Sequence, residues 1–258
     1  MYPVLFRLGS LEITSFGVMV ALGALLGILL LRREAARTGL DAAKITDAAL
    51  IGVLGGLTGA KLLYVIEHWA EPLSETLLSR GGMSWFGGMT GGLVAGLLAV
   101  RWQRLGLMAV LSAAAPSLAL GQAVGRVGCL LVGDDYGRPT RLPWGMAFPE
   151  GLPPTTARVH PTQIYEALVL LALTVLLVRL RARGMRDRLV FASYLIGAGL
   201  SRFLIELVRV NVPVFLGLTT AQLFSIGVVL LGVWLASTRE SAPQAAPARA
   251  KTSRKPRR

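Results

Sequence analysis

The stretch FGVMVALGALLGILLL, residues 16–31, carries no charged side chain and is followed directly by Arg32 and Arg33. A run of this kind approaches the ~20 apolar residues that a helix needs to cross a bilayer. The chain is 53% hydrophobic with a mean hydropathy of +0.60, values that fit an integral helical membrane protein. Comparable runs follow at 47–66, 86–100, 107–124, 162–180, 189–205 and 221–237. We therefore expect an all-α, polytopic membrane protein with about seven transmembrane helices.

The basic residues predict the orientation of these helices. Arg32 and Arg33 follow the first run rather than precede it, which is typical of an uncleaved first helix with its N-terminus outside. With seven spans, about two thirds of the chain's 27 Lys and Arg residues fall on one side, which we expect to be cytoplasmic. They lie in short segments between apolar runs, a distribution that argues against a nucleic-acid partner despite the net charge of +13. These residues are Arg32, Arg33, Arg37, Lys44, Arg101, Arg104, Arg179, Arg181, Arg183, Arg186, Arg188, Arg239, Arg249, Lys251, Arg254, Lys255, Arg257 and Arg258.

The runs predict one membrane domain, residues 1–238, and a disordered basic cytoplasmic tail, residues 239–258. The tail holds mainly Ala, Pro, Arg and Lys and shows no apolar pattern. Small residues recur at four-residue spacing in the first three runs, and such faces let helices pack closely in lipid. We interpret them as packing seams rather than ligand contacts: Gly23 and Gly27, then Gly52, Gly56 and Ala60, then Gly88, Gly92 and Gly96.

The segment GRVGCLLVGDDYG, residues 125–137, begins a long connection that is predicted to run outside the membrane over 125–161. Its glycines allow backbone N–H groups to approach a ligand closely, and Arg126 offers a fork of donors suited to a phosphate. Capture of a lipid headgroup is one interpretation. The other is a tight turn in which Arg126 pairs with Asp134 or Asp135, and the residues alone favour neither.

Three charged residues near the end of the sixth run lie on one helix face. Arg202, Glu206 and Arg209 are spaced by four and three residues. Because one carboxylate cannot neutralise two arginines, a net positive charge is expected on this face, and a phosphate would complete it. His160 is either a general base or, more in keeping with its place before a helix, a capping residue. Asp134 and Asp135 offer only weak support for a cation, so we expect no metal and no cofactor.

These residues together resemble the bacterial prolipoprotein diacylglyceryl transferase family. The resemblance extends in order from Gly17 to about Gly232, which is nearly the whole membrane part. The matching motifs are Gly125-Arg126 with Gly133 and Gly137, GGMS at 81–84 followed by Gly87-Gly88, HPTQIYE at 160–166, RFLIELVR at 202–209, and Leu218-Thr219 with Gln222.

The resemblance implies a bacterial inner-membrane enzyme. Its members transfer diacylglycerol from phosphatidylglycerol to the lipobox cysteine of a prolipoprotein and release glycerol phosphate. By this resemblance Arg126 and Arg202 are catalytic and bind the phosphate. Gly137 shapes the loop, while Glu206, Arg209 and His160 complete the substrate site.

Four positions depart from the family pattern. Family members often carry Asn where this chain has Cys129, and well-studied members carry Tyr, His and Tyr where it has Phe16, Phe86 and Ala198. The identity of the general base is therefore left open: His160, Asp134 or Asp135 could substitute, and nothing in the sequence selects among them. Cys129 itself is expected to be a small buried filler. Two alternatives therefore remain: a noncatalytic relative that binds or moves anionic lipid, and a transferase with another acceptor.

Overall fold

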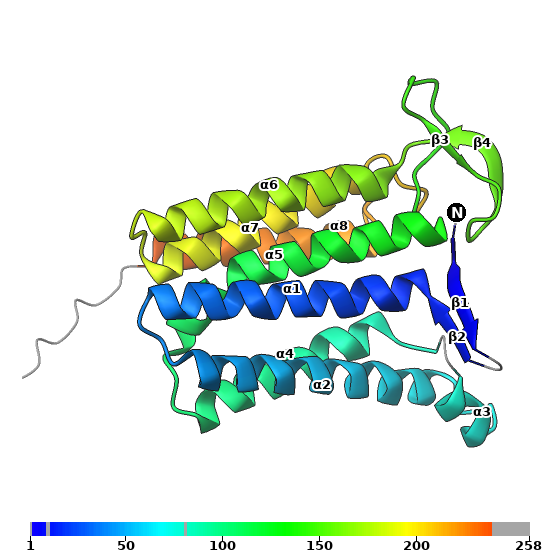
Figure 1. The fold of residues 1–258 in the computed structure, drawn as a ribbon. Coiled ribbons are helices and arrows are strands. Elements are labelled where there is room, and N and C mark those ends of the chain that lie inside the picture. The colour runs from blue at the N-terminus through cyan, green and yellow to red at the C-terminus, as the bar shows by residue number, and fades with distance from the viewer. Residues whose placement is uncertain (1, 9–10, 80–81, 239–258) are drawn as a thin grey trace, which may run out of the picture.

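The computed structural model describes residues 2–8, 11–79 and 82–238. Within these residues seven long helices form, and they lie side by side (Figure 1). Gly81, the first residue of the GGMS motif, and the expected tail 239–258 lie outside the described residues. The long helices are α1 (Ser15–Arg37), α2 (Ala42–Glu67), α4 (Trp85–Trp102), α5 (Leu107–Val132), α6 (Thr162–Ala182), α7 (Asp187–Glu206) and α8 (Thr220–Ser237).

The prediction of a mostly helical, polytopic membrane protein is confirmed. In the described part of the chain, six helices are long and apolar enough to cross a membrane. Helix α4 forms at the third expected span but is not among these six; five glycines and Arg101 make it less apolar. The short helix α3 (Leu73–Leu78) was not expected from the sequence. Two small antiparallel hairpins were also unexpected: β1 (Val4–Leu8) with β2 (Leu11–Thr14), and β3 (Met146–Phe148) with β4 (Thr155–Val159).

The expectation that residue 125 begins a loop is wrong, because α5 continues to Val132. In apolar surroundings a helix is the conformation that satisfies its own backbone groups, and this outweighs the weak helix propensity of glycine. Gly128 also has a packing role: a Cβ there would lie 3.1 Å from the Met19 Cβ of α1. The helix ends at Gly133, whose φ of 78° is left-handed, so the outer connection starts there.

The predicted packing seams are confirmed, with the closest contacts between α2 and α4. A Cβ added to Gly59 or Gly87 would lie within 3.0 Å of the other residue's carbonyl oxygen. The predicted Gly56 lies on the looser side of the same seam, where an added Cβ would lie 3.3 Å from the Gly88 carbonyl oxygen. Between α1 and α5, a Cβ on Gly23 would lie 3.1 Å from the Gly121 carbonyl oxygen. These approaches bring helix backbones into direct contact.

A buried ion pair joins helices at the opposite end of the bundle from the hairpins. Arg181 of α6 places Nε 2.9 Å from Glu34 Oε2 of α1, and the two side chains are 3% and 1% exposed. The same guanidinium donates to the Ser112 hydroxyl of α5. Both hairpins lie at the other end (Figure 1). The two ends of the bundle are therefore chemically distinct.

We expect the hairpin end to face outside the cell and the Arg181 end to face the cytoplasm, because of where the basic residues lie. Reporter fusions after Arg37 and Arg183 should read cytoplasmic, and a fusion after Glu150 should read external. The measurement is reporter activity in whole cells, normalised to fusion abundance. A cytoplasmic reading after Glu150 would rule out the seven-span orientation.

Candidate functional site

Three arginines and three carboxylates form a closed chain of ion pairs near the hairpin end of the bundle. We call these six residues the arginine ring. They come from α5, the connection that follows it, α6, α7 and the turn after α7. The contacts are Arg126–Asp135 at 2.8 Å, Arg126–Glu166 at 3.0 Å, Arg202–Glu166 at 3.9 Å, Arg202–Glu206 at 3.0 Å, Arg209–Glu206 at 3.7 Å, and Arg209–Asp135.

The expectation of a surplus positive charge on this helix face is wrong. Glu206 does meet both Arg202 and Arg209, as the helix spacing predicts. Glu166 and Asp135 supply the other two carboxylates, so the ring is balanced. The pairing of Arg126 with Asp135, one of the two interpretations from sequence, is also observed.

The predicted catalytic arginines converge on one atom, Oε2 of Glu166. Arg126 Nε lies 3.0 Å from it and Arg202 NH1 lies 3.9 Å away. Arg202 NH1 is buried and has no hydrogen-bond partner among the described residues. A guanidinium N–H in this state can donate to an anion, and an arginine pair of this kind can hold two oxygens of one phosphate.

The ring is more accessible on one side. The Glu206 and Arg209 side chains are only 0% and 8% exposed, while Arg126 and Arg202 are 22% and 25% exposed. Asp135 is the most open member at 39%. The ring is therefore accessible mainly at Arg126, Arg202 and Asp135, and Glu206 and Arg209 lie behind them.

The connection after α5 folds back over the start of α6 and carries Asp135 into the ring. Its backbone is fixed by two side chains of α6: Thr162 Oγ1 donates to the Asp135 carbonyl over 2.6 Å, and Gln163 donates to the Asp134 carbonyl. Asp135 has a φ of 61°, a left-handed conformation that aspartate tolerates better than most residues. Position and conformation together aim the Asp135 carboxylate at Arg126 and Arg209.

Gly137 lies where the connection touches both α6 and the end of α7. Its N–H donates to the His160 carbonyl over 2.9 Å, and it pairs with Arg209 in an isolated bridge. A Cβ on Gly137 would lie 2.5 Å from the Val208 carbonyl oxygen and 2.9 Å from the His160 Cβ. The close approach therefore requires glycine, which agrees with a loop-shaping role.

Glu206 also connects the ring to α8. Its Oε1 accepts from the Thr219 hydroxyl over 2.8 Å and from the Asn211 amide. Thr219 is the N-cap of α8 and forms a capping box with Gln222. This carboxylate thus holds two arginines on one side and the entry to the last helix on the other.

His160 belongs to a separate cluster. Its Nδ1 lies 3.3 Å from the Tyr165 hydroxyl, which accepts from Trp144 Nε1 over 2.7 Å. The expectation that His160 caps the helix is off by one residue, because Pro161 is the N-cap and α6 begins at Thr162. No ion pair or side-chain hydrogen bond joins His160 to the ring in the described part of the chain.

Two neighbouring aspartates, Asp135 in the ring and Asp134 beside it, have opposite pKa shifts. Burial and the neighbouring Asp135 charge raise the pKa of Asp134. Burial also tends to raise the pKa of Asp135, but the hydrogen bond and charge of Arg209, and then Arg126, outweigh burial and lower this pKa.

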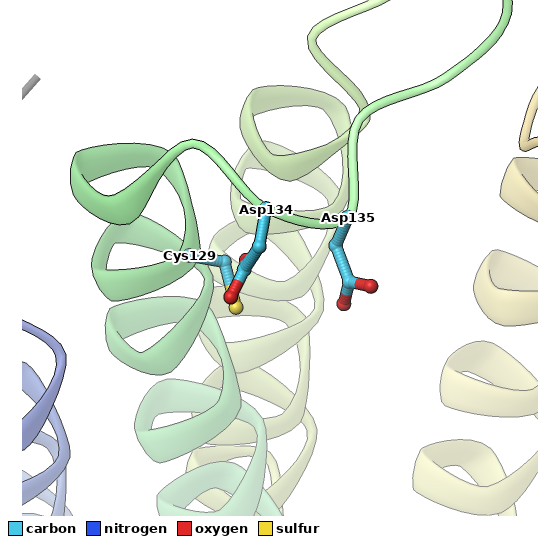
Figure 2. Close-up of side chains that lie close together, drawn as sticks. All are labelled: Cys129, Asp134 and Asp135. Atoms are coloured by element: carbon cyan, nitrogen blue, oxygen red, sulfur yellow. The ribbon is translucent and has the colours of Figure 1, made fainter. Parts of the chain in front are cut away.

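Possible ligand atoms of Cys129, Asp134 and Asp135 lie within 4.8 Å of one another (Figure 2). Nothing beyond this proximity indicates a metal. Cys129 is buried, as expected for a filler.

Sequence reasoning missed Glu166, although a signal was available. It is a carboxylate within the apolar run of α6, and ionisable residues in such runs are costly and usually functional. Its two arginine partners stand 40 residues before it and 36 residues after it in the chain. Helical spacing cannot reveal pairs at such separations.

Comparisons with known proteins agree on one family. The family model described as prolipoprotein diacylglyceryl transferase matches residues 3–238. A relative from Clostridium tetani is 33% identical over 91% of this chain and 96% of its own length. Relatives from Geobacter sulfurreducens and Synechococcus elongatus are 37% and 34% identical, over 91% and 93% of this chain and 94% and 90% of their own lengths. All three are named phosphatidylglycerol–prolipoprotein diacylglyceryl transferase.

The close contacts of Gly137 predict that Gly137→Ala destabilises the protein by ~1–3 kcal/mol through overpacking. The measurement is the thermal unfolding midpoint in detergent. Gly125→Ala is the matched control, because a Cβ at Gly125 of α5 meets nothing within 4 Å. That change should be neutral or should stabilise the helix by ~0.5–1 kcal/mol. Equal midpoints for the two variants would contradict the assignment.

Proposed function

Because the chain belongs to the prolipoprotein diacylglyceryl transferase family, we propose that it transfers diacylglycerol from phosphatidylglycerol to the lipobox cysteine of a prolipoprotein, releasing glycerol phosphate. The chain is a multi-pass membrane protein and an enzyme of the transferase class. We place it in the bacterial inner membrane, with the arginine ring towards the outside.

The observation that carries this proposal is the convergence of Arg126 and Arg202 on a single oxygen of Glu166. A phosphate oxygen in the same neighbourhood would find donors from both guanidinium groups. Asp135 is the most exposed carboxylate of the ring, and it holds Arg126 and Arg209. We propose that the phosphodiester displaces the Asp135 carboxylate from Arg126 and reaches the unpartnered NH1 of Arg202 with a second oxygen, so that one negative charge takes the place of another.

The reaction then breaks the ester bond between the glyceryl carbon and the phosphate oxygen. The acceptor's thiolate attacks that carbon, a C–S bond forms, and glycerol phosphate leaves with an additional negative charge. Arginines already in place stabilise this charge as it develops. Since the nucleophile comes from the acceptor, no serine or cysteine of this chain is required to attack.

A noncatalytic role in binding or moving anionic lipid is the second candidate. The observation that favours it is the loss of polar groups at Phe16, Phe86 and Ala198 relative to the family pattern. Phe16 and Phe86 are 43% and 49% exposed. Release of glycerol phosphate, rather than lipid binding alone, distinguishes the transferase from the noncatalytic role.

Arg126→Lys and Arg202→Lys should both slow glycerol phosphate release. Lysine keeps the charge but loses the bidentate fork. Losing a charge-assisted contact of ~1.5–3 kcal/mol that strengthens in the transition state lowers the rate about 10- to 150-fold. The assay uses purified protein, phosphatidylglycerol vesicles and a peptide with a lipobox cysteine. Arg158→Lys is the matched control, because among the described residues the Arg158 side chain donates to the loop carbonyls of Gly145 and Pro143 and to no member of the ring.

Release must also depend on the acceptor thiol, so a serine peptide should give none. Folded wild-type protein that binds phosphatidylglycerol but releases no glycerol phosphate would support the lipid-binding candidate instead.

Cys129→Ala should keep most of the transfer rate, because the acceptor supplies the nucleophilic sulfur. The measurement is the rate of lipid transfer to the peptide, with mass spectrometry of the intact enzyme. Complete loss of activity in folded Cys129→Ala, together with a lipid adduct on wild-type Cys129, would show that this chain attacks the lipid itself.

A further inference from the structure

The carboxylate of Asp134 lies beside the arginine ring but takes no part in its ion pairs. Its possible ligand oxygen lies within 4.8 Å of an Asp135 carboxylate oxygen and of Cys129 Sγ. In Figure 2 the Asp134 carboxylate lies next to the cysteine sulfur, whereas Asp135 points away from both. Arg126 NH1 touches the same two neighbours, at 2.8 Å from Asp135 Oδ2 and 3.9 Å from Cys129 Sγ. Asp134 is therefore next to the place where we put the phosphodiester.

The position of Asp134 is fixed by its backbone, while its side chain meets Cys129 and leaves one carboxylate oxygen without a donor. Its N–H donates to the Cys129 carbonyl over 3.2 Å, and Gln163 donates to its carbonyl oxygen. Its side-chain Oδ1 is buried and has no hydrogen-bond partner among the described residues. A buried acceptor without a donor is costly, and such groups call for a functional explanation.

From this geometry we infer that Asp134 is the general base that takes the proton from the acceptor thiol. This inference rests on the proposed transferase reaction. The proton of the thiol passes to a carboxylate oxygen of Asp134, and the sulfur keeps the electron pair of the S–H bond. The thiolate then forms the C–S bond while the carbon–oxygen bond to the phosphate breaks. Asp134 afterwards returns the proton to water.

The charges around Asp134 explain why it suits this role better than its neighbour. The charged and titratable groups that face it are Asp135, Cys129, Arg126 and Arg209. Asp135 has two arginine partners that hold its pKa low, so it is a weak base. Burial and the charge of Asp135 raise the pKa of Asp134, which brings its basicity closer to that of a thiol.

The test compares cysteine and selenocysteine acceptor peptides with wild-type protein and Asp134→Asn. A selenol is more acidic than a thiol and is ionised near neutral pH, so it needs no base. With the cysteine peptide, Asp134→Asn should be slower by roughly 100-fold or more. With the selenocysteine peptide it should approach the wild-type rate. Phosphatidylglycerol binding should be unchanged, and Asp134→Glu should recover part of the cysteine rate.

The pH profile gives a second readout. The wild-type rate should fall as pH drops through the raised pKa of Asp134, because only the carboxylate accepts a proton. In Asp134→Asn this limb should vanish, and the rate should climb about tenfold per pH unit towards the thiol pKa of ~8.5. Glu150→Gln, which removes a charge from an exposed position of the same connection, should match the wild type.

Equal loss with both peptides would assign Asp134 a structural role and overturn the inference, as would a wild-type cysteine rate in Asp134→Asn. In either case an active wild-type protein leaves the proposed function standing. A wild-type protein with no thiol-dependent release would overturn the proposed function and this inference together.

Discussion

Charge pairing among partly buried arginines is the constraint on which the hairpin end of the protein depends. A guanidinium at membrane depth is costly unless carboxylates meet it. Removing one partner of such a pair destabilises a protein more than replacing both partners with well-packed apolar residues. Arg126, Arg202 and Arg209 come from different segments, so their carboxylates must be brought in from α6, α7 and the connection after α5. Meeting this requirement fixes how these segments sit relative to one another. Three features help to hold these segments in place: the turn at Gly133, the close approach at Gly137 and the cap of α8.

The same constraint bears on the proposed exchange of the Asp135 carboxylate for a phosphodiester. A phosphodiester and the Asp135 carboxylate each carry one negative charge and each offers two oxygens to guanidinium groups. Exchange of one for the other keeps the charge balance, so the proposed binding of lipid does not require the ring to be rebuilt. Glu206, at the least exposed position, keeps Arg202 and Arg209 in place throughout such an exchange.

Helices and arginines were predictable from the sequence, whereas the partners of the arginines were not. Apolar runs locate α1 and its successors because the period and length of such runs are local properties. Arg202 and Glu206 were paired correctly for the same reason, since they share one helix face. Glu166 was missed because its partners are distant in the chain, and only tertiary packing brings α5, α6 and α7 together. The extension of α5 through Gly128 was missed because glycine weakens a helix in water more than it does in a packed apolar setting.

Helix α6 is tied by charge at both of its ends. Near its start Glu166 meets arginines of α5 and α7, and in its last turn Arg181 meets Glu34 of α1. Rotation about the helix axis or sliding along it would break both ties at once. Helix α6 therefore cannot adjust its tilt or depth independently to a thicker or thinner bilayer. Any hydrophobic mismatch must be absorbed by the surrounding lipid or by helices without such ties, which keeps the height of the arginine ring constant relative to the bundle.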